Sequence, residues 1–184
     1  MTSRGLGFDR NRVFSGKSVI EMKRMINQGM ALGTFNADTA SYSEVTQGDP
    51  VSELSFDLTL NDFAVVAGTR IHFNPCLSGF QRQPFDTISV RIYEMEDIID
   101  SIVYRFPAEY RAEYIPPPVY VDGPYGSYRY SVETLNDGSL LFRRKMNLNK
   151  GIYTGERARE LFAFLNTAAR SDQRRIYLNR AQRN

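Results

Sequence analysis

Residues 128–178 constrain the fold more than any other stretch, because they indicate a hairpin, a helix and a strand in close succession. Asn136-Asp137-Gly138 tolerates positive φ angles and therefore predicts a tight turn between two strands. After Tyr153, apolar residues recur at helical spacing, at Ala158, Leu161, Phe162, Leu165, Ala168 and Ala169. We expect this stripe to bury against a sheet, and residues 174–178 to form the last strand.

Short apolar segments separated by turn residues fill residues 51–121. Leu54, Phe56, Leu58 and Leu60 alternate with polar residues, which is typical of a strand with one buried face. Further strands are expected at residues 70–73, 88–93, 98–105, 110–115, 128–133 and 139–146. This pattern predicts a mostly β fold, an antiparallel Ig-like β-sandwich with one packed C-terminal helix and an N-terminal helical extension.

The sequence of residues 1–49 predicts a different set of elements from the rest of the chain. Residues 1–17 are polar and without a period, so we expect a loose segment. Ser18 and Glu21 form a capping box, and Met22, Met25, Ile26 and Met30 follow on one helical face. Ala37 to Pro50 is polar and indicates a linker. The predicted organisation is a loose segment at 1–17, helix and linker at 18–49, and a β-sandwich module at 50–184.

The composition limits the classes of partner. Hydrophobic residues make up 42% and charged residues 24% of the chain, which favours a globular fold. The net charge of only +2 gives no general attraction to polyanions, so we expect no nucleic-acid partner. No run of 18 apolar residues predicts a membrane span, and the first residues do not resemble a signal peptide. The sequence indicates no oligomeric state.

Several residues carry a resemblance to a known family. They are Phe106-Pro107 followed by Tyr110, a proline stop at Pro116, the Asp137-Gly138 hairpin, and Gly151-x-Tyr153 before a helix. In this order they resemble the C-terminal β-rich module of bacterial exported transglutaminase-like proteins, over residues 50–180. In that family a β-domain of unknown function precedes the transglutaminase core. The resemblance implies an accessory module of a periplasmic or cell-envelope protein.

The family's catalytic order is not present. The transglutaminase-like core carries Cys, His and Asp in that order, whereas here His72 precedes Cys76 around an Asn74-Pro75 turn. We therefore expect a non-catalytic chain, with Cys76 buried or half-buried and His72 on a surface strand. The alternative, a Cys–His dyad, requires the turn to bring the two side chains together.

The Tyr-rich segment from Tyr110 to Tyr130, with three prolines at 116–118, is the predicted contact surface. We expect Tyr120, Tyr125 and Tyr128 to form it, because interfaces favour apolar rings with polar ends. Packing of these rings in the core or at a strand edge is the alternative. Two functions follow. The first is an accessory module that contacts a transglutaminase-like core domain or another protein, and the second is a free-standing glycan- or peptide-binding module.

Two charged clusters predict no further site. Asp86, Glu94, Glu96, Asp97 and Asp100 are acidic, but they lack the D-x-D-x-D-G spacing of a calcium loop. We expect neither a metal nor a cofactor. In the basic run at 143–145, strand alternation places Arg143 and Lys145 on one face, and Arg144 on the other with Leu140, Phe142 and Met146.

Overall fold

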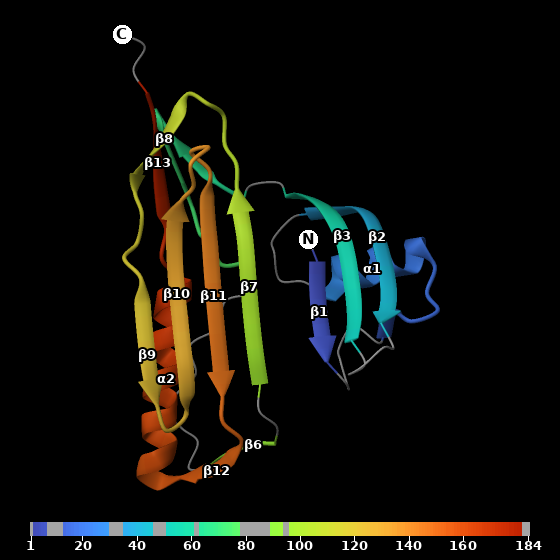
Figure 1. The fold of residues 1–184 in the computed structure, drawn as a ribbon, viewed down its shortest axis with the longest axis vertical. Helices are drawn as coiled ribbons and strands as arrows, with labels where there is room; N and C mark the ends of the chain where they lie inside the picture. The colour runs from blue at the N-terminus through green and yellow to red at the C-terminus, as the bar shows by residue number, and fades with distance from the viewer. Residues whose placement is uncertain are drawn as a thin grey trace. The chain divides into compact units, whose positions relative to one another are not determined.

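The computed structural model describes residues 2–6, 13–29, 35–45, 51–60, 63–77, 89–93 and 96–181. The chain divides into two compact units, Met1–Phe63 and Ala64–Asn184 (Figure 1). Each unit has its own buried cluster of apolar side chains. They are therefore described one after the other.

The first unit is a three-stranded antiparallel sheet with one helix. The strand order is β1 (Thr2–Leu6), β3 (Val51–Leu60) and β2 (Phe35–Val45). The helix α1 (Val19–Gly29) packs against β2. Their shared core consists of Met22, Ile26, Ala37, Ala40, Leu54 and Phe56.

The start of α1 confirms the predicted capping box. The Ser18 backbone N–H donates to Glu21 Oε2 at 2.9 Å, and the Glu21 N–H donates to Ser18 Oγ at 3.3 Å. These reciprocal bonds satisfy two donors that a helix start otherwise leaves unpaired. Met22 and Ile26 are buried as expected, Met25 is half-buried, and Met30 lies outside the described residues.

Two predictions for the first unit are wrong. Residues 1–17 contain the strand β1, and the expected linker contains the strand β2, both paired with β3. In β2, Ala37 and Ala40 are buried while Thr39 and Ser41 are exposed, across a register shift between residues 37 and 39. The backbone ladder with β3 therefore forms without the strict apolar alternation that sequence patterns detect. The structure also places β3 in the first unit, so the division follows Phe63 and not residue 49.

The second unit is the mostly β sandwich that the sequence predicts, with a helix near its C-terminus. One antiparallel sheet has the order β7 (Glu96–Tyr104), β11 (Leu140–Leu148), β10 (Gly126–Thr134), β9 (Val119–Gly123). The other has the order β4 (Val65–Ala67), β5 (Arg70–Phe73), β13 (Ile176–Arg180), β8 (Tyr110–Tyr114). A two-stranded sheet pairs β12 (Gly151–Thr154) with β6 (Ser89–Ile92).

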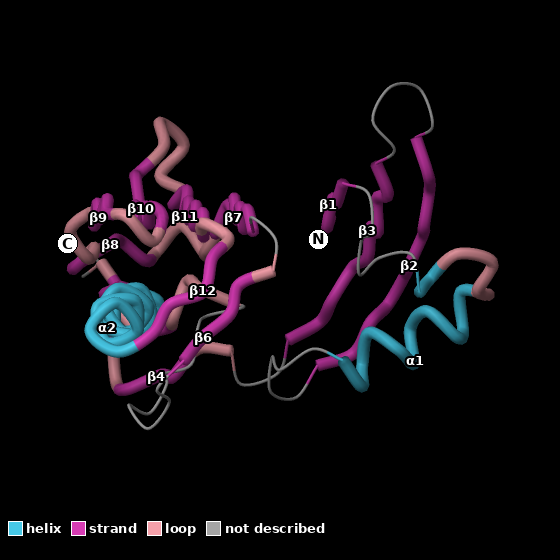
Figure 2. Tube along the Cα trace, turned by 90° about the horizontal axis from the view of Figure 1, so that it is seen from below, coloured by secondary structure: helices cyan, strands magenta, loops and turns pink. Residues whose placement is uncertain are grey.

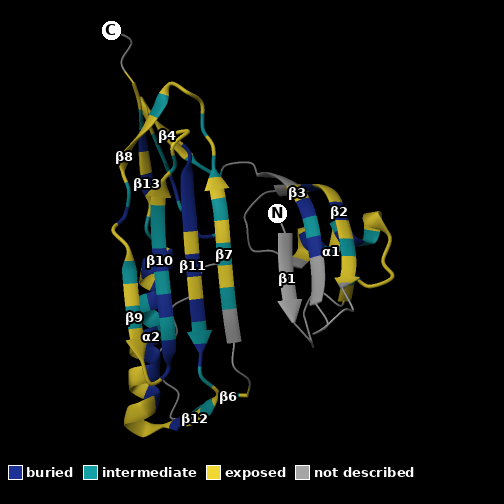
Figure 3. Cartoon of the chain, viewed as in Figure 1, coloured by how far each residue is buried: buried dark blue, intermediate teal, exposed yellow. Residues whose placement is uncertain are grey.

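The helix α2 (Gly155–Asp172) covers a face of the first of these sheets (Figure 2). Leu161 and Phe164 from the helix share one core with Tyr128, Tyr130 and Phe142 from β10 and β11. Of the predicted stripe, Leu161 and Phe162 are buried and Leu165 is half-buried. Figure 3 shows the buried and exposed residues that alternate along β11. Neither described helix has the length and apolar character needed to cross a membrane.

Two glycine positions close the hairpins of this unit. Gly138 has a φ of 82° in the predicted turn between β10 and β11. Gly126, the first residue of β10 after its turn from β9, has a φ of 141°, and a Cβ there would lie 1.9 Å from the Asn147 carbonyl oxygen. Only glycine allows β10 and β11 to approach this closely.

The packing of α2 generates a stability prediction. We expect Leu161→Ala to lower the free energy of unfolding by about 2–5 kcal/mol, because the truncation leaves a cavity between helix and sheet. Ile152→Ala is the control, since Ile152 is 56% exposed and should change stability by no more than about 0.5 kcal/mol. Urea unfolding followed by circular dichroism measures both. An unchanged midpoint for Leu161→Ala would show that the helix does not depend on this contact.

Candidate functional site

The guanidinium of Arg144, in the middle of β11, is enclosed in the core of the second unit. Its side chain is 1% exposed. Nη1 donates to Asp172 Oδ2 at 2.7 Å, and Nη2 lies 2.5 Å from Asp100 Oδ2. Asp172 is the last residue of α2 and Asp100 lies on β7. One cation therefore joins the end of the helix to two strands of the sheet.

Two more side chains belong to this group. The Tyr128 hydroxyl donates to Asp172 Oδ1 at 2.5 Å, and Arg144 Nη1 also donates to Cys76 Sγ at 3.2 Å. We name Arg144, Asp172, Asp100, Tyr128 and Cys76 the Arg144 cluster. It gathers side chains from β7, β10, β11, α2 and the segment after β5.

The electrostatics keep the cation of the Arg144 cluster charged. Burial lowers the pKa of Arg144, but the neighbouring Cys76, Asp172 and Asp100 outweigh it, and the pKa is raised. Burial also raises the pKa of Tyr128, and its hydrogen bond to Asp172 adds to this effect. Burial raises the pKa of Asp100 in spite of the attraction of Arg144. These groups bond to one another inside the core, so the cluster holds the fold together.

The three tyrosines that the sequence predicts as a contact surface do not lie together on the surface. Tyr120 is 65% exposed, whereas Tyr125 and Tyr128 are 5% and 0% exposed. The prediction is therefore wrong for Tyr125 and Tyr128. Alternation along β10 turns Tyr128 into the core, and the Tyr125 ring packs edge-on against Tyr153 with its hydroxyl donating to Glu160.

Cys76 and His72 take part in different contacts. Cys76 is buried in the Arg144 cluster, which confirms its predicted burial. His72 is half-buried on β5, and its ring lies 5.4 Å from the ring of Tyr177. In the described part of the chain, no three His, Cys, Asp or Glu residues gather in a way that could hold a metal. Asp86 and Glu94 of the acidic cluster lie outside the described residues.

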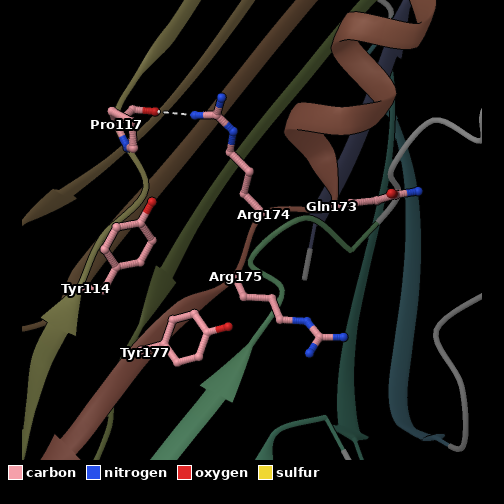
Figure 4. A pocket seen from close by; sticks show the side chains of 6 residues that line it. All are labelled: Tyr114, Pro117, Gln173, Arg174, Arg175 and Tyr177. Carbon is pink, nitrogen blue, oxygen red and sulfur yellow. Dashed lines mark hydrogen bonds between the residues drawn. The ribbon is translucent and has the colours of Figure 1, made fainter.

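An open pocket of about 580 Å³ lies beside the end of α2 (Figure 4). Tyr114 at the end of β8 and Tyr177 on β13 are cross-strand partners, with ring centroids 6.0 Å apart and ring planes at 67°. Both rings are at least one third exposed. We name this the arginine–tyrosine pocket, and its lining consists of Tyr114, Pro117, Gln173, Arg174, Arg175 and Tyr177.

The two arginines of this pocket directly follow the C-cap residue of α2. Arg174 Nη1 donates to the Pro117 carbonyl at 2.9 Å, which fixes this guanidinium beside the proline segment. Figure 4 shows that Arg175 extends away from Pro117, to the side opposite the ring of Tyr177. Arg175 is exposed and Arg174 half-buried. The pocket therefore presents two cations and two phenol rings to a ligand.

A second pocket, of about 640 Å³, lies at the other end of β8. Arg105, Arg111 and the β10–β11 turn at residues 136–138 contribute to its lining, so we name it the hairpin pocket. Arg111 Nη1 donates to the carbonyls of Ala108 and Tyr110, at 2.5 and 2.8 Å. The strand β8 thus has an arginine-containing pocket at each end.

These arginines form no ion pair with a carboxylate of the described residues, but Asp137 also lines the hairpin pocket and attracts Arg105 electrostatically. None of the ion pairs between described residues includes Arg105, Arg111, Arg174 or Arg175. Glu113, on β8 itself, pairs with Arg70 across the sheet. The arginine–tyrosine pocket, whose lining contains no carboxylate, therefore suits an anionic group, which charge-assisted hydrogen bonds from arginine would hold. In the hairpin pocket Asp137 offsets part of the positive charge of Arg105 and Arg111.

The comparisons with known proteins agree with the extent of the second unit. The family model described as Domain of Unknown Function with solved-structure structure (DUF3858) matches residues 70–178, which is more than half of the chain. This chain belongs to the DUF3858 family. The comparison with curated proteins found no match, and neither did the comparison with solved structures.

The sequence contains a signal for the buried ion pair of the DUF3858 domain, but the patterns above do not identify this pair. Arg144 lies on the apolar face of its strand with Phe142 and Met146, which indicates a buried cation. Asp172 continues the helical stripe of Leu165, Ala168 and Ala169 at the spacing of three to four residues. A charge on the apolar face of a strand and another on the apolar face of a helix are candidates for a buried ion pair.

The Arg144 cluster generates the second prediction. We expect Asp172→Ala to lower the free energy of unfolding by about 3–5 kcal/mol, because it leaves the buried Arg144 short of a partner. Glu133→Ala is the matched control: it also removes an acid from an ion pair, with Arg143, but both of these side chains are more than half exposed. This control should cost less than about 1 kcal/mol. Equal urea midpoints for the two variants would contradict the role of the cluster.

Proposed function

We propose that this DUF3858 chain is a non-catalytic interaction module of a transglutaminase-like exported bacterial protein, acting in the periplasm or at the cell envelope. Its resemblance to the C-terminal module of such proteins supports the association. The family match at residues 70–178 lies wholly inside the second unit and inside the stretch that carries the resemblance. The partner in this proposal is the transglutaminase-like core domain.

The observation that carries the proposal is the distribution of reactive and binding groups. Cys76, Asp172 and Tyr128 are enclosed and bonded to one another or to Arg144. The arginines and tyrosines beside β8, in contrast, line open pockets. Enclosed groups cannot reach a substrate, whereas exposed Tyr and Arg are the residues that protein interfaces favour.

The non-catalytic part of the proposal rests on the contacts of Cys76 and His72. A cysteine nucleophile needs a base within hydrogen-bond reach and an open path to the substrate. The Cys76 sulfur faces the Arg144 guanidinium in the core, and the His72 ring packs on Tyr177. Neither contact is that of a nucleophile with its base.

A free-standing glycan- or peptide-binding module is the second candidate. It is favoured by the exposed ring of Tyr120, which has the Arg129 guanidinium carbon 5.6 Å from its centroid. An exposed aromatic ring can stack on a sugar or pack on a peptide. If this candidate is right, the chain will bind a glycan array and will not bind a core domain. Tyr120→Ala will then abolish the binding to the glycan array.

The third prediction tests the proposed function directly. We expect the chain to bind the transglutaminase-like core domain encoded in the same genome, and Tyr114→Ala with Tyr177→Ala to weaken this binding in isothermal titration calorimetry. Tyr93→Ala is the control, since Tyr93 is 78% exposed and does not line either pocket. The chain alone should show no amidase or transglutaminase turnover. Turnover that disappears in Cys76→Ala would overturn the proposal.

A further inference from the structure

The strand β8 is unusual for a sandwich strand because neither of its faces is covered. Four of its five residues, Arg111 to Tyr114, are exposed and the first is half-buried. A strand that packs on a core from one side alternates between buried and exposed residues. The side chains of β8 therefore contribute little to the core, and both faces are open to a partner.

The strand β8 also lies at the edge of its sheet. It pairs with β13 on one side, and it is the last strand in the order β4-β5-β13-β8 of the described residues. Tyr110 uses its backbone locally, since its N–H donates to the Pro107 carbonyl and its own carbonyl accepts from Arg111. The register with β13 shifts between Tyr177 and Leu178, which leaves Glu113 as an extra residue on β8, so the edge available to an added strand is the backbone at Ala112 and Tyr114, on either side of this bulge.

Positive charge predominates at the two ends of this edge, although Asp137 also lines the hairpin pocket. The arginine–tyrosine pocket places Arg174 and Arg175 beside the end of β8, and the hairpin pocket places Arg105 and Arg111 beside its start. The acid on the strand, Glu113, is already paired with Arg70. A ligand that lies along β8 would thus meet cations at both ends, and carboxylates are the groups that arginines hold with directional hydrogen bonds.

From this combination we infer that β8 is the docking strand for an extended acidic peptide segment of a partner protein. The peptide adds as a strand at Ala112–Tyr114, and its carboxylates bind the arginines of the two pockets. The rings of Tyr114 and Tyr177 cover the aliphatic part of the bound side chains. This inference rests on the proposed function, which it deepens by naming the chemistry of the recognised segment.

A peptide fits these features better than a glycan or a nucleic acid. Addition to a sheet edge requires a polypeptide backbone, which alternates donors and acceptors at the spacing of a strand. The rings along the sheet are tilted, by 42° between His72 and Tyr177 and by 67° between Tyr114 and Tyr177. They therefore do not form the flat platform on which sugar rings or bases stack.

The probe that tests the inference is a fluorescent seven-residue peptide, Glu-Glu-Val-Thr-Val-Glu-Glu, blocked at both ends. It spans about 23 Å as a strand. Each end carries two adjacent glutamates, so that at each end one glutamate side chain points to either face of the sheet. The first matched probe replaces every glutamate by glutamine, and the second carries N-methyl groups on the three central residues. Fluorescence anisotropy at low ionic strength measures the Kd of each with the full chain.

We expect the acidic peptide to bind and both matched probes to lose at least about tenfold in affinity, because each lacks one of the two kinds of contact. In the protein, Arg174→Gln with Arg175→Gln should weaken binding by about tenfold or more. The control Arg143→Gln, which removes an exposed arginine of β11, should leave it unchanged. Unchanged urea midpoints show that a variant remains folded.

Three outcomes would overturn the inference. Equal binding of the glutamine peptide removes the acidic specificity, and equal binding of the N-methylated peptide removes strand addition. Equal binding of a single-stranded oligonucleotide of the same charge, weakened to the same extent by the arginine changes, shows unspecific attraction of anions. Binding of the core domain that survives the arginine changes would leave the proposed function standing while this inference fails.

Discussion

The ion pair between Arg144 and Asp172 is the interaction on which the second unit depends. It joins the middle of a central strand to the last residue of the only long helix among the described residues, and both side chains are 1% exposed. A buried pair of this kind adds little net stability compared with apolar residues, but it strongly penalises any arrangement that separates the two charges. The pair therefore selects the position of the end of α2 on the sheet.

The position of the end of α2 also determines where the arginine–tyrosine pocket forms. Arg174 and Arg175 follow Asp172 after one residue, and β13 begins immediately behind them. Because β13 pairs with β8 on one side and β5 on the other, the end of α2 also places Tyr177 beside Tyr114 and His72. The end of α2 thus contributes to both features. Asp172 lies in the buried Arg144 cluster, which stabilises the fold, and the next residues line the open arginine–tyrosine pocket, which a partner can reach.

Sequence patterns predicted the features of the fold that depend on interactions between residues close together in the chain. Ser18 and Glu21 bond within one helical turn, Gly138 supplies its own positive φ, and the stripe around Leu161 follows from helical spacing. Patterns could not predict features that depend on a distant partner. The polar β2 is a strand because of its ladder with β3. The buried Tyr128 hydroxyl has a partner because Asp172, distant in the sequence, accepts its hydrogen bond. The arginine–tyrosine pocket exists because β13 pairs with β8.

The measurement that tests this account most directly is a double-mutant cycle on the central pair, with Arg144→Met, Asp172→Leu and the double variant unfolded in urea. We predict strong coupling. Arg144→Met leaves the buried Asp172 without its cation, and Asp172→Leu leaves Arg144 with Asp100 as its one remaining acidic partner in the cluster. The double variant should therefore be more stable than the sum of the two losses allows, by about 1–3 kcal/mol. Purely additive losses would show that the two charges do not interact in the folded protein. That result would contradict the central role of the pair.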